Sequence, residues 1–159
     1  MQHWRHTKIV CAAVCALSLI IFSAGCKASP QKDLEKSPFI ATEQNQDVVL
    51  SIKEKTVTSE TQTITLTYTN KSGTEYSYGG VDFLDIEIDG IWYTVLHKDN
   101  VAWDMLAFLL PANGSAESSF PIKMYYEDLV SGKYRVIEKL NTLDSTHIGS
   151  YITAEFTVA

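Results

Sequence analysis

The sequence is poor in the residues that hold small secreted domains together. It has three cysteines in 159 residues, and two of them, Cys11 and Cys15, lie inside an apolar N-terminal segment. The third is Cys26, so the chain after residue 26 contains no thiol. A small domain that depends on internal disulfides is therefore excluded, because such a framework needs at least one cysteine pair.

Positive charge is also scarce. The 13 Lys and Arg residues are outnumbered by 19 Asp and Glu residues, which gives a net charge of −6. Nucleic-acid binding depends on clustered Lys and Arg, so this balance argues against a nucleic-acid partner. Residues 1–25 carry Arg5 and Lys8 but no acid, and the remaining chain has 11 basic and 19 acidic residues. Such a domain is not attracted to an anionic membrane by its charge.

The longest apolar run is too short for a permanent membrane span. Residues 9–22 are apolar apart from Ser18, and at ~1.5 Å per residue they cover about 21 Å of a ~30 Å hydrocarbon core. His3, Arg5, His6 and Lys8 precede this run as a positive segment. This order predicts that residues 1–25 are an export signal.

The end of this segment, Ser23-Ala24-Gly25-Cys26, resembles the lipobox of bacterial lipoprotein precursors, although Ser23 replaces the common Leu. The resemblance implies cleavage before Cys26 and a diacylglyceryl group on its sulfur. The predicted protein is extracytoplasmic and anchored to the bacterial cell membrane through this lipid. An ordinary secretory signal with a chance cysteine is the alternative.

Residues 26–46 have the composition of a tether. They contain Pro30 and Pro38 and few large hydrophobic side chains, so they bury too little to offset the entropy of ordering. We therefore predict a lipidated Cys26 followed by a flexible linker, and a folded domain over residues 47–159.

The domain has the period of β-strands. Ile64, Leu66 and Tyr68 alternate with threonines, and similar alternation occurs over 84–89 and 151–158. Asp89-Gly90 predicts a hairpin that joins 82–88 to 91–96. Further strands are expected at 48–57, 103–109, 115–122 and 133–139. About seven short strands separated by turns predict an all-β fold, an immunoglobulin-like antiparallel β-sandwich.

The segments TITLTYTNKSGTEYSYG, IDGIWYTV, SGKYRVIEKL and YITAEFTV resemble the bacterial Ig-like domains of envelope lipoproteins, over about residues 48–158. The resemblance implies a sandwich fold and an envelope location, and it implies no catalytic residue. Trp92 is expected as a large inward-facing anchor. Tyr134, after the Ser131-Gly132 corner, is expected to tie that corner to the backbone through its hydroxyl.

Sequence motifs for metal binding or catalysis are weak or absent. Asp85, Glu87 and Asp89, with Asp82 nearby, are the best metal candidates, but alternate strand residues lie ~6.6–6.8 Å apart and calcium needs six to eight oxygens at ~2.3–2.6 Å. A solvent-facing row is therefore favoured, with no metal and no cofactor. The motifs G-x-S-x-G and H-E-x-x-H are absent, and only two histidines follow residue 25. We predict that the protein is not an enzyme.

Two features concern partners. The run 105–110 is apolar at every position, which favours burial over an exposed docking strand. Tyr125 and Tyr126 are adjacent, so in an extended chain they point to opposite sides and both are not expected in the core. They are the candidate contacts for an envelope protein or polymer. The predicted function is a non-enzymatic binding module, and the alternative is an inhibitor or accessory subunit of an extracytoplasmic enzyme such as a protease.

Overall fold

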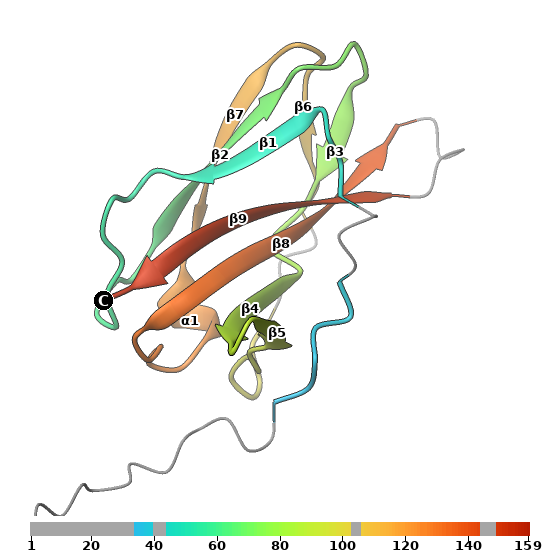
Figure 1. Ribbon diagram of the computed structural model, residues 1–159. Coiled ribbons are helices and arrows are strands. Elements are labelled where there is room, and N and C mark those ends of the chain that lie inside the picture. The colour runs from blue at the N-terminus through green and yellow to red at the C-terminus, as the bar shows by residue number, and fades with distance from the viewer. Residues whose placement is uncertain (1–33, 40–43, 103–105, 144–148) are drawn as a thin grey trace, which may run out of the picture. The chain divides into compact units, whose positions relative to one another are not determined.

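The computed structural model describes residues 34–39, 44–102, 106–143 and 149–159 (Figure 1). The chain divides into two units, Met1–Pro30 and Gln31–Ala159, and every described residue belongs to the second. The predicted export signal and Cys26 therefore lie outside the described residues. No helix among the described residues has the length and apolar character that a membrane crossing requires.

Nine strands and one helical turn make up the regular structure of the described residues. In chain order they are β1 (Val48–Ile52), β2 (Ile64–Asn70), β3 (Tyr76–Tyr78), β4 (Phe83–Ile88), β5 (Ile91–Thr94), β6 (Phe108–Leu110), β7 (Ser115–Phe120), α1 (Ile122–Tyr125), β8 (Gly132–Thr142) and β9 (Ser150–Val158). The predicted all-β sandwich is confirmed, with two more strands than the seven or so expected.

The strands form two antiparallel sheets (Figure 1). The smaller sheet has the order β1-β2-β7. The larger sheet is built on the long strand β8, which pairs with β9 along one edge and with β4 and then β3 along the other. β5 lies beyond β4, and β6 lies beyond β3. Among the described residues, β6 and β7 are thus terminal strands of different sheets.

The core lies between the two sheets and follows from the period-two pattern. Ile64, Leu66 and Tyr68 of β2 are buried, and the intervening threonines are only partly covered. On β8, Tyr134 and Val136 are buried in the same way. Alternate side chains of a strand point to opposite faces, so each strand contributes one apolar row to the space between the sheets.

Two local predictions are confirmed. Asp89 and Gly90 have positive φ values of 51° and 77°, and the residues that flank them, Ile88 and Ile91, are paired across the hairpin. Glycine supplies such a conformation without steric cost. At the other corner, the Tyr134 hydroxyl donates a hydrogen bond of 2.8 Å to the Val130 carbonyl oxygen.

The structure also includes bonds upstream of residue 47. Thr94 N–H donates to the Glu35 carbonyl at 2.9 Å, and Ser37 N–H donates to the Trp92 carbonyl at 3.0 Å, so residues 35–37 run along β5. Asn45 N–H donates to the Tyr151 carbonyl of β9 at 2.6 Å. The segment 26–46, predicted as a linker, therefore contains described residues that are hydrogen-bonded to the domain.

Candidate functional site

β6 and β7 follow each other in the chain but belong to different sheets. The connection between them is held by Asn70, whose side-chain amide donates to the carbonyl oxygens of Pro111 at 2.9 Å and Thr74 at 2.8 Å. A Cβ at Gly114 would lie 2.5 Å from Pro111 Cγ, so this turn requires glycine. The conformation of the turn is thus fixed. The two strands on either side of it form the two edges of one open side of the sandwich.

Small side chains on β7 leave this side of the sandwich unfilled. Ala116 pairs with the buried Tyr68 and therefore faces inward, as Ser118 does two residues later. Across the gap, Phe108 of β6 is paired with the inward-facing Tyr78, yet it is 45% exposed. The inward side chains in the middle of β7, Ala116 and Ser118, are too small to cover its ring.

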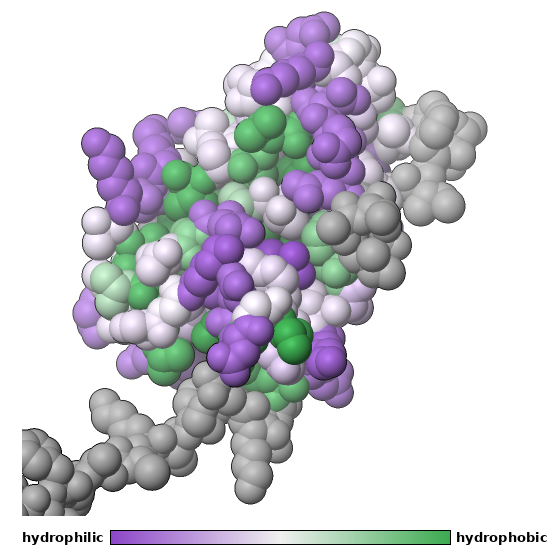
Figure 2. All heavy atoms as spheres, viewed as in Figure 1, coloured by the Kyte–Doolittle hydropathy of each residue, from purple (hydrophilic) through white to green (hydrophobic). Residues whose placement is uncertain are grey.

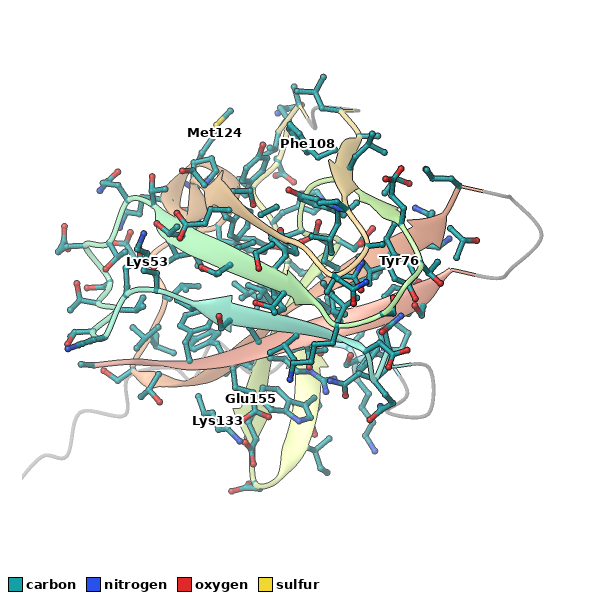
Figure 3. All side chains as sticks on the ribbon, turned by 90° about the horizontal axis from the view of Figure 1, so that it is seen from above. Lys53, Tyr76, Phe108, Met124, Lys133 and Glu155 are labelled. Carbon is teal, nitrogen blue, oxygen red and sulfur yellow. The ribbon has the colours of Figure 1, made fainter. Side chains whose placement is uncertain are left out.

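The result is a groove of about 480 Å³, which we call the β6–β7 groove; its lining includes Leu66, Tyr78, Phe108, Ser118, Met124 and Tyr125. This volume lies in the ~300–1,000 Å³ range of ligand pockets. In Figure 3, Phe108 and Met124 lie on the same side of the domain, opposite Lys133 and Glu155. The groove is therefore far from the charged outer face of the larger sheet.

Aromatic rings form much of the groove wall. The ring centroids of Tyr68 and Tyr78 are 4.3 Å apart, and those of Tyr78 and Phe108 are 5.6 Å apart. Phe120 and Tyr125 stack at 5.6 Å with an interplanar angle of 13°. These pairs hold the rings in place, since aromatic pairs at such spacings are mutually attractive. The wall is thus preformed and apolar.

The described part of the apolar run, residues 106–110, lies at the rim of this groove, and residue 105 lies outside the described residues. Leu106, just before β6, is 60% exposed. Leu109 is exposed to the same extent and lies on the face of β6 opposite Phe108. Only Leu110 of the described residues in the run is buried. The prediction of a buried strand is therefore wrong, because β6 is a terminal strand with no strand beyond it among the described residues.

A buried carboxyl lies behind the groove wall. The Tyr68 hydroxyl donates to Glu138 Oε2 at 2.6 Å and is 3.1 Å from the Ser118 hydroxyl, which lines the groove. Glu138 is fully buried, and no described atom hydrogen-bonds its Oε1. Burial raises the pKa of Glu138 to about 8, and the nearby Asp82 carboxyl adds to this effect. The side chain is consequently protonated at neutral pH, the form that burial favours.

Tyr125 and Tyr126 are both buried, so the expectation that they cannot both be in the core is wrong. The physical reason is α1, whose helical turn ends at Tyr125 and breaks the alternation of an extended chain. Tyr125 lies on the groove wall. Tyr126 packs edge-on against Phe120, and burial raises its pKa. Contact of either residue with a partner stays a prediction.

Trp92 does not anchor the core as predicted. It lies on the outer face of the larger sheet, where the Arg135 guanidinium is 4.5 Å and Lys133 Nζ is 5.2 Å from its ring centroid. Trp92 pairs with Glu87, which salt-bridges Lys133 at 2.9 Å. The indole thus packs over the charged side chains of this sheet face through cation–π contacts. On the face shown in Figure 2, hydrophobic side chains are interspersed among hydrophilic ones.

The acidic row is split among separate roles. Asp85 is fully buried and accepts two hydrogen bonds from Arg135, at 2.7 and 2.9 Å, so its predicted solvent exposure is wrong. Asp82 accepts a hydrogen bond from Lys139 N–H, and Asp89 forms the hairpin turn. Within the described residues, no three His, Cys, Asp or Glu side chains come together as metal ligands would.

The groove could have been found from two sequence signals taken together. The first is the small residues Ala116 and Ser118 at inward positions of a strand, and the second is an apolar run in the strand before it. Neither signal identifies a groove alone, because the sequence does not show that β6 and β7 join different sheets.

Known proteins resemble this chain through a family model and a distant solved structure. The search of curated proteins gives no significant match. Among solved structures, the ASH/PapD-like domain of human CEP192 (PapD-like domain 7) is similar with 12% identity and a TM-score of 0.33, over 79% of this chain and 94% of that chain. A sequence model of the family described as "Bacterial Ig-like domain" matches residues 44–156. The match spans both sheets, and the protein therefore belongs to the bacterial Ig-like domain family.

Proposed function

We propose that this protein is a non-enzymatic binding module, anchored by a lipid on Cys26 to the outer side of the bacterial cell membrane, and that the β6–β7 groove is its binding surface. The observation that carries the proposal is the exposed, inward-facing Phe108 in a groove of about 480 Å³. An apolar ring left uncovered costs free energy in water, at roughly 25 cal/mol per Å². A partner that covers the groove recovers that free energy.

The family supports the non-enzymatic part of the proposal, since Ig-like domains are typically interaction modules. The ionisable groups of the groove support it as well. Glu138 is sealed behind Tyr68, and Glu117 is held by Lys53 at 3.1 Å. Glu138 is therefore closed off from a bound ligand, and Glu117 is engaged in an ion pair. The protease-inhibitor alternative stays a prediction.

The anchor would hold the domain close to the bilayer. Cys26 is nine residues before Glu35, the first described residue with a backbone bond to β5. At ~3.3 Å per residue this segment spans at most about 30 Å. Two acyl chains suffice for stable attachment, since each buried CH₂ contributes about 0.8 kcal/mol. The partner is therefore expected at or near the membrane surface.

Site-specific photocrosslinking in living cells tests the proposal. A benzophenone amino acid replaces Phe108 in the lipidated protein, and the matched control carries it at Val49 of β1, which is 44% exposed against 45% for Phe108. We expect a discrete crosslinked species from position 108 that is absent from position 49. The species should disappear when Met124→Asp is added, because that change places a charge at the groove rim.

Equal labelling from both positions would contradict the proposal, as would a species that persists in the Met124→Asp variant. Protease resistance of each variant in the same cells shows that the domain is folded. The anchor is tested separately by fatty-acid labelling of Cys26.

A further inference from the structure

We propose that the β6–β7 groove binds an extended peptide segment of another protein, which adds as a strand to the free edge of β7 and inserts alternate apolar side chains into the groove. This inference rests on the proposed function and names its ligand class. Three observations carry it: the backbone pattern of β7, the side chains that face the groove, and the charge of the groove.

The backbone of β7 presents an unused row of donors and acceptors. Asn70 N–H donates to the Gly114 carbonyl at 2.8 Å, and the same register continues along β2 and β7. In an antiparallel ladder, hydrogen-bonded and non-hydrogen-bonded pairs alternate. The backbone groups at positions 116, 118 and 120 therefore bond to β2, and those of Ser115, Glu117 and Ser119 point away from the sheet.

The other edge of β2 supports this assignment. Lys53 N–H donates to the Thr65 carbonyl at 3.0 Å, so the odd-numbered residues of β2 bond to β1 and the even-numbered ones bond to β7. Among the described residues no strand lies beyond β7. Edge strands are usually protected by charge, proline or a bulge. β7 has only Glu117, whose carboxylate is held on the outer face by Lys53.

The side chains beside this edge match a strand. A peptide paired with β7 would point every second side chain inward, over Ala116 and Ser118 and toward Phe108. Successive inward side chains are ~6.6–6.8 Å apart, and the groove has space for more than one of them. The edge strand supplies affinity through its backbone and the groove supplies specificity for apolar residues, as in other strand-addition complexes.

The polarity of the groove favours a peptide over a lipid chain. An acyl chain would cover Phe108 but would leave the outward N–H and C=O groups of Glu117 and Ser119 beside hydrocarbon, at the cost of buried unpaired polar groups. A strand satisfies them. Charged inward side chains are disfavoured, because Glu117, the only charged residue among the described residues of the lining, is already paired with Lys53.

A yeast-displayed library of linear ten-residue peptides tests the inference. The bait is the full chain, purified with its lipid in detergent, and the counter-selection bait is the Phe108→Asp variant. Leu109→Asp is the matched control, because Leu109 lies next in β6 but on the opposite face. We expect enriched peptides with apolar residues at alternate positions, and at least tenfold weaker binding to Phe108→Asp than to Leu109→Asp.

Backbone changes on both molecules test the strand itself. Ser119→Pro removes an N–H that makes no ladder bond, and proline is tolerated at such edge positions. We expect it to bind an enriched peptide at least tenfold more weakly than Ser119→Ala does, and we expect thermal melting to show both variants folded. N-methylation of the synthetic peptide should weaken binding at every second residue and have little effect between them. Ser115→Pro repeats the test if Ser119→Pro unfolds.

The outcomes separate this inference from the proposed function. If peptides bind through Phe108 but N-methylation shows no period of two, the groove binds a peptide in another conformation and strand addition is overturned. If no peptide is enriched while position 108 still crosslinks a partner in cells, the peptide class is overturned and the binding groove stands. Loss of the crosslink as well overturns both.

Discussion

The buried carboxyl of Glu138 makes the stability of the domain depend on pH in a direction opposite to that of most carboxylates. Its pKa is raised from an ordinary value of 4.5 to about 8, chiefly by burial. The folded state therefore retains a proton that the unfolded chain releases above pH 4.5. The contribution of Glu138 to stability is greatest below that pH and falls as the pH rises toward 8, where the folded state also loses the proton.

The magnitude follows from the two pKa values. A change of one pKa unit corresponds to 1.36 kcal/mol, so the full effect above pH 8 is about 5 kcal/mol, of which about 4 kcal/mol develops between pH 5 and pH 9. Groups that face Glu138 do not reverse the sign. The Tyr68 hydroxyl of β2 donates a hydrogen bond to Glu138, and the Ser118 hydroxyl of β7 lies 3.1 Å from that hydroxyl. The Asp82 carboxyl, between β3 and β4, raises the pKa of Glu138 further.

Glu138→Gln removes the titration and keeps the acceptor for the Tyr68 hydroxyl. Urea denaturation of the unlipidated chain at pH 5 and pH 9 gives the loss of unfolding free energy over this range for each protein. We expect this loss to be about 4 kcal/mol smaller in the variant than in the wild type. Glu75→Gln, an exposed change of the same charge, is the control. Parallel pH profiles for the wild type and Glu138→Gln would refute the reasoning.

Three further changes give clear expectations. Tyr134→Phe removes the hydrogen bond to Val130 and should lower the free energy of unfolding by about 1 kcal/mol in urea denaturation, and an unchanged midpoint would contradict its corner role. Arg135→Met leaves the buried Asp85 without its cationic partner and should cost about 3–5 kcal/mol, and full stability in the same assay would contradict this expectation. Cys26→Ser should abolish fatty-acid labelling and release the protein from membranes, and retained labelling would contradict lipid attachment at Cys26.

Features with a local cause were predictable from the sequence. The Asp89-Gly90 hairpin needs only two residues that accept positive φ between apolar neighbours. The hydrogen bond of Tyr134 spans only four residues, to Val130. The alternation in β2 gave its buried face directly. The fold class followed from these elements, because repeated short strands with one apolar face must stack as two sheets.

Features that depend on distant partners were not predictable. Trp92 was expected inside because it is large and apolar, but its pairing with Glu87 places it on the outer face, beside Arg135, which is 43 positions later. Asp85 is buried with a charge partner that is also distant in the sequence, since the Arg135 guanidinium pairs with it. Both tyrosines after Pro121 are buried because α1 interrupts the extended chain. β3 was missed because three residues are too few to show a period.

The site itself depends on topology. An apolar run such as 105–110 suits a buried strand as well as a rim strand, and only the pairing of β6 with β3 and of β7 with β2 shows that the run borders an open side. With this topology known, the small inward residues of β7 indicate a groove. The hydrogen-bond partner of Glu138 was equally hidden, because Tyr68 and Glu138 are 70 positions apart.

Residue-resolved amide hydrogen exchange of β7 tests the central claim most directly. In the free protein, the amides of Glu117 and Ser119 should exchange at least tenfold faster than those of Ala116 and Ser118, which bond to β2. Addition of an enriched peptide should slow Glu117 and Ser119 to the rate of their neighbours. Equal protection of both sets in the free protein, or a bound state in which Glu117 and Ser119 still exchange quickly, would contradict a binding groove with an open strand edge.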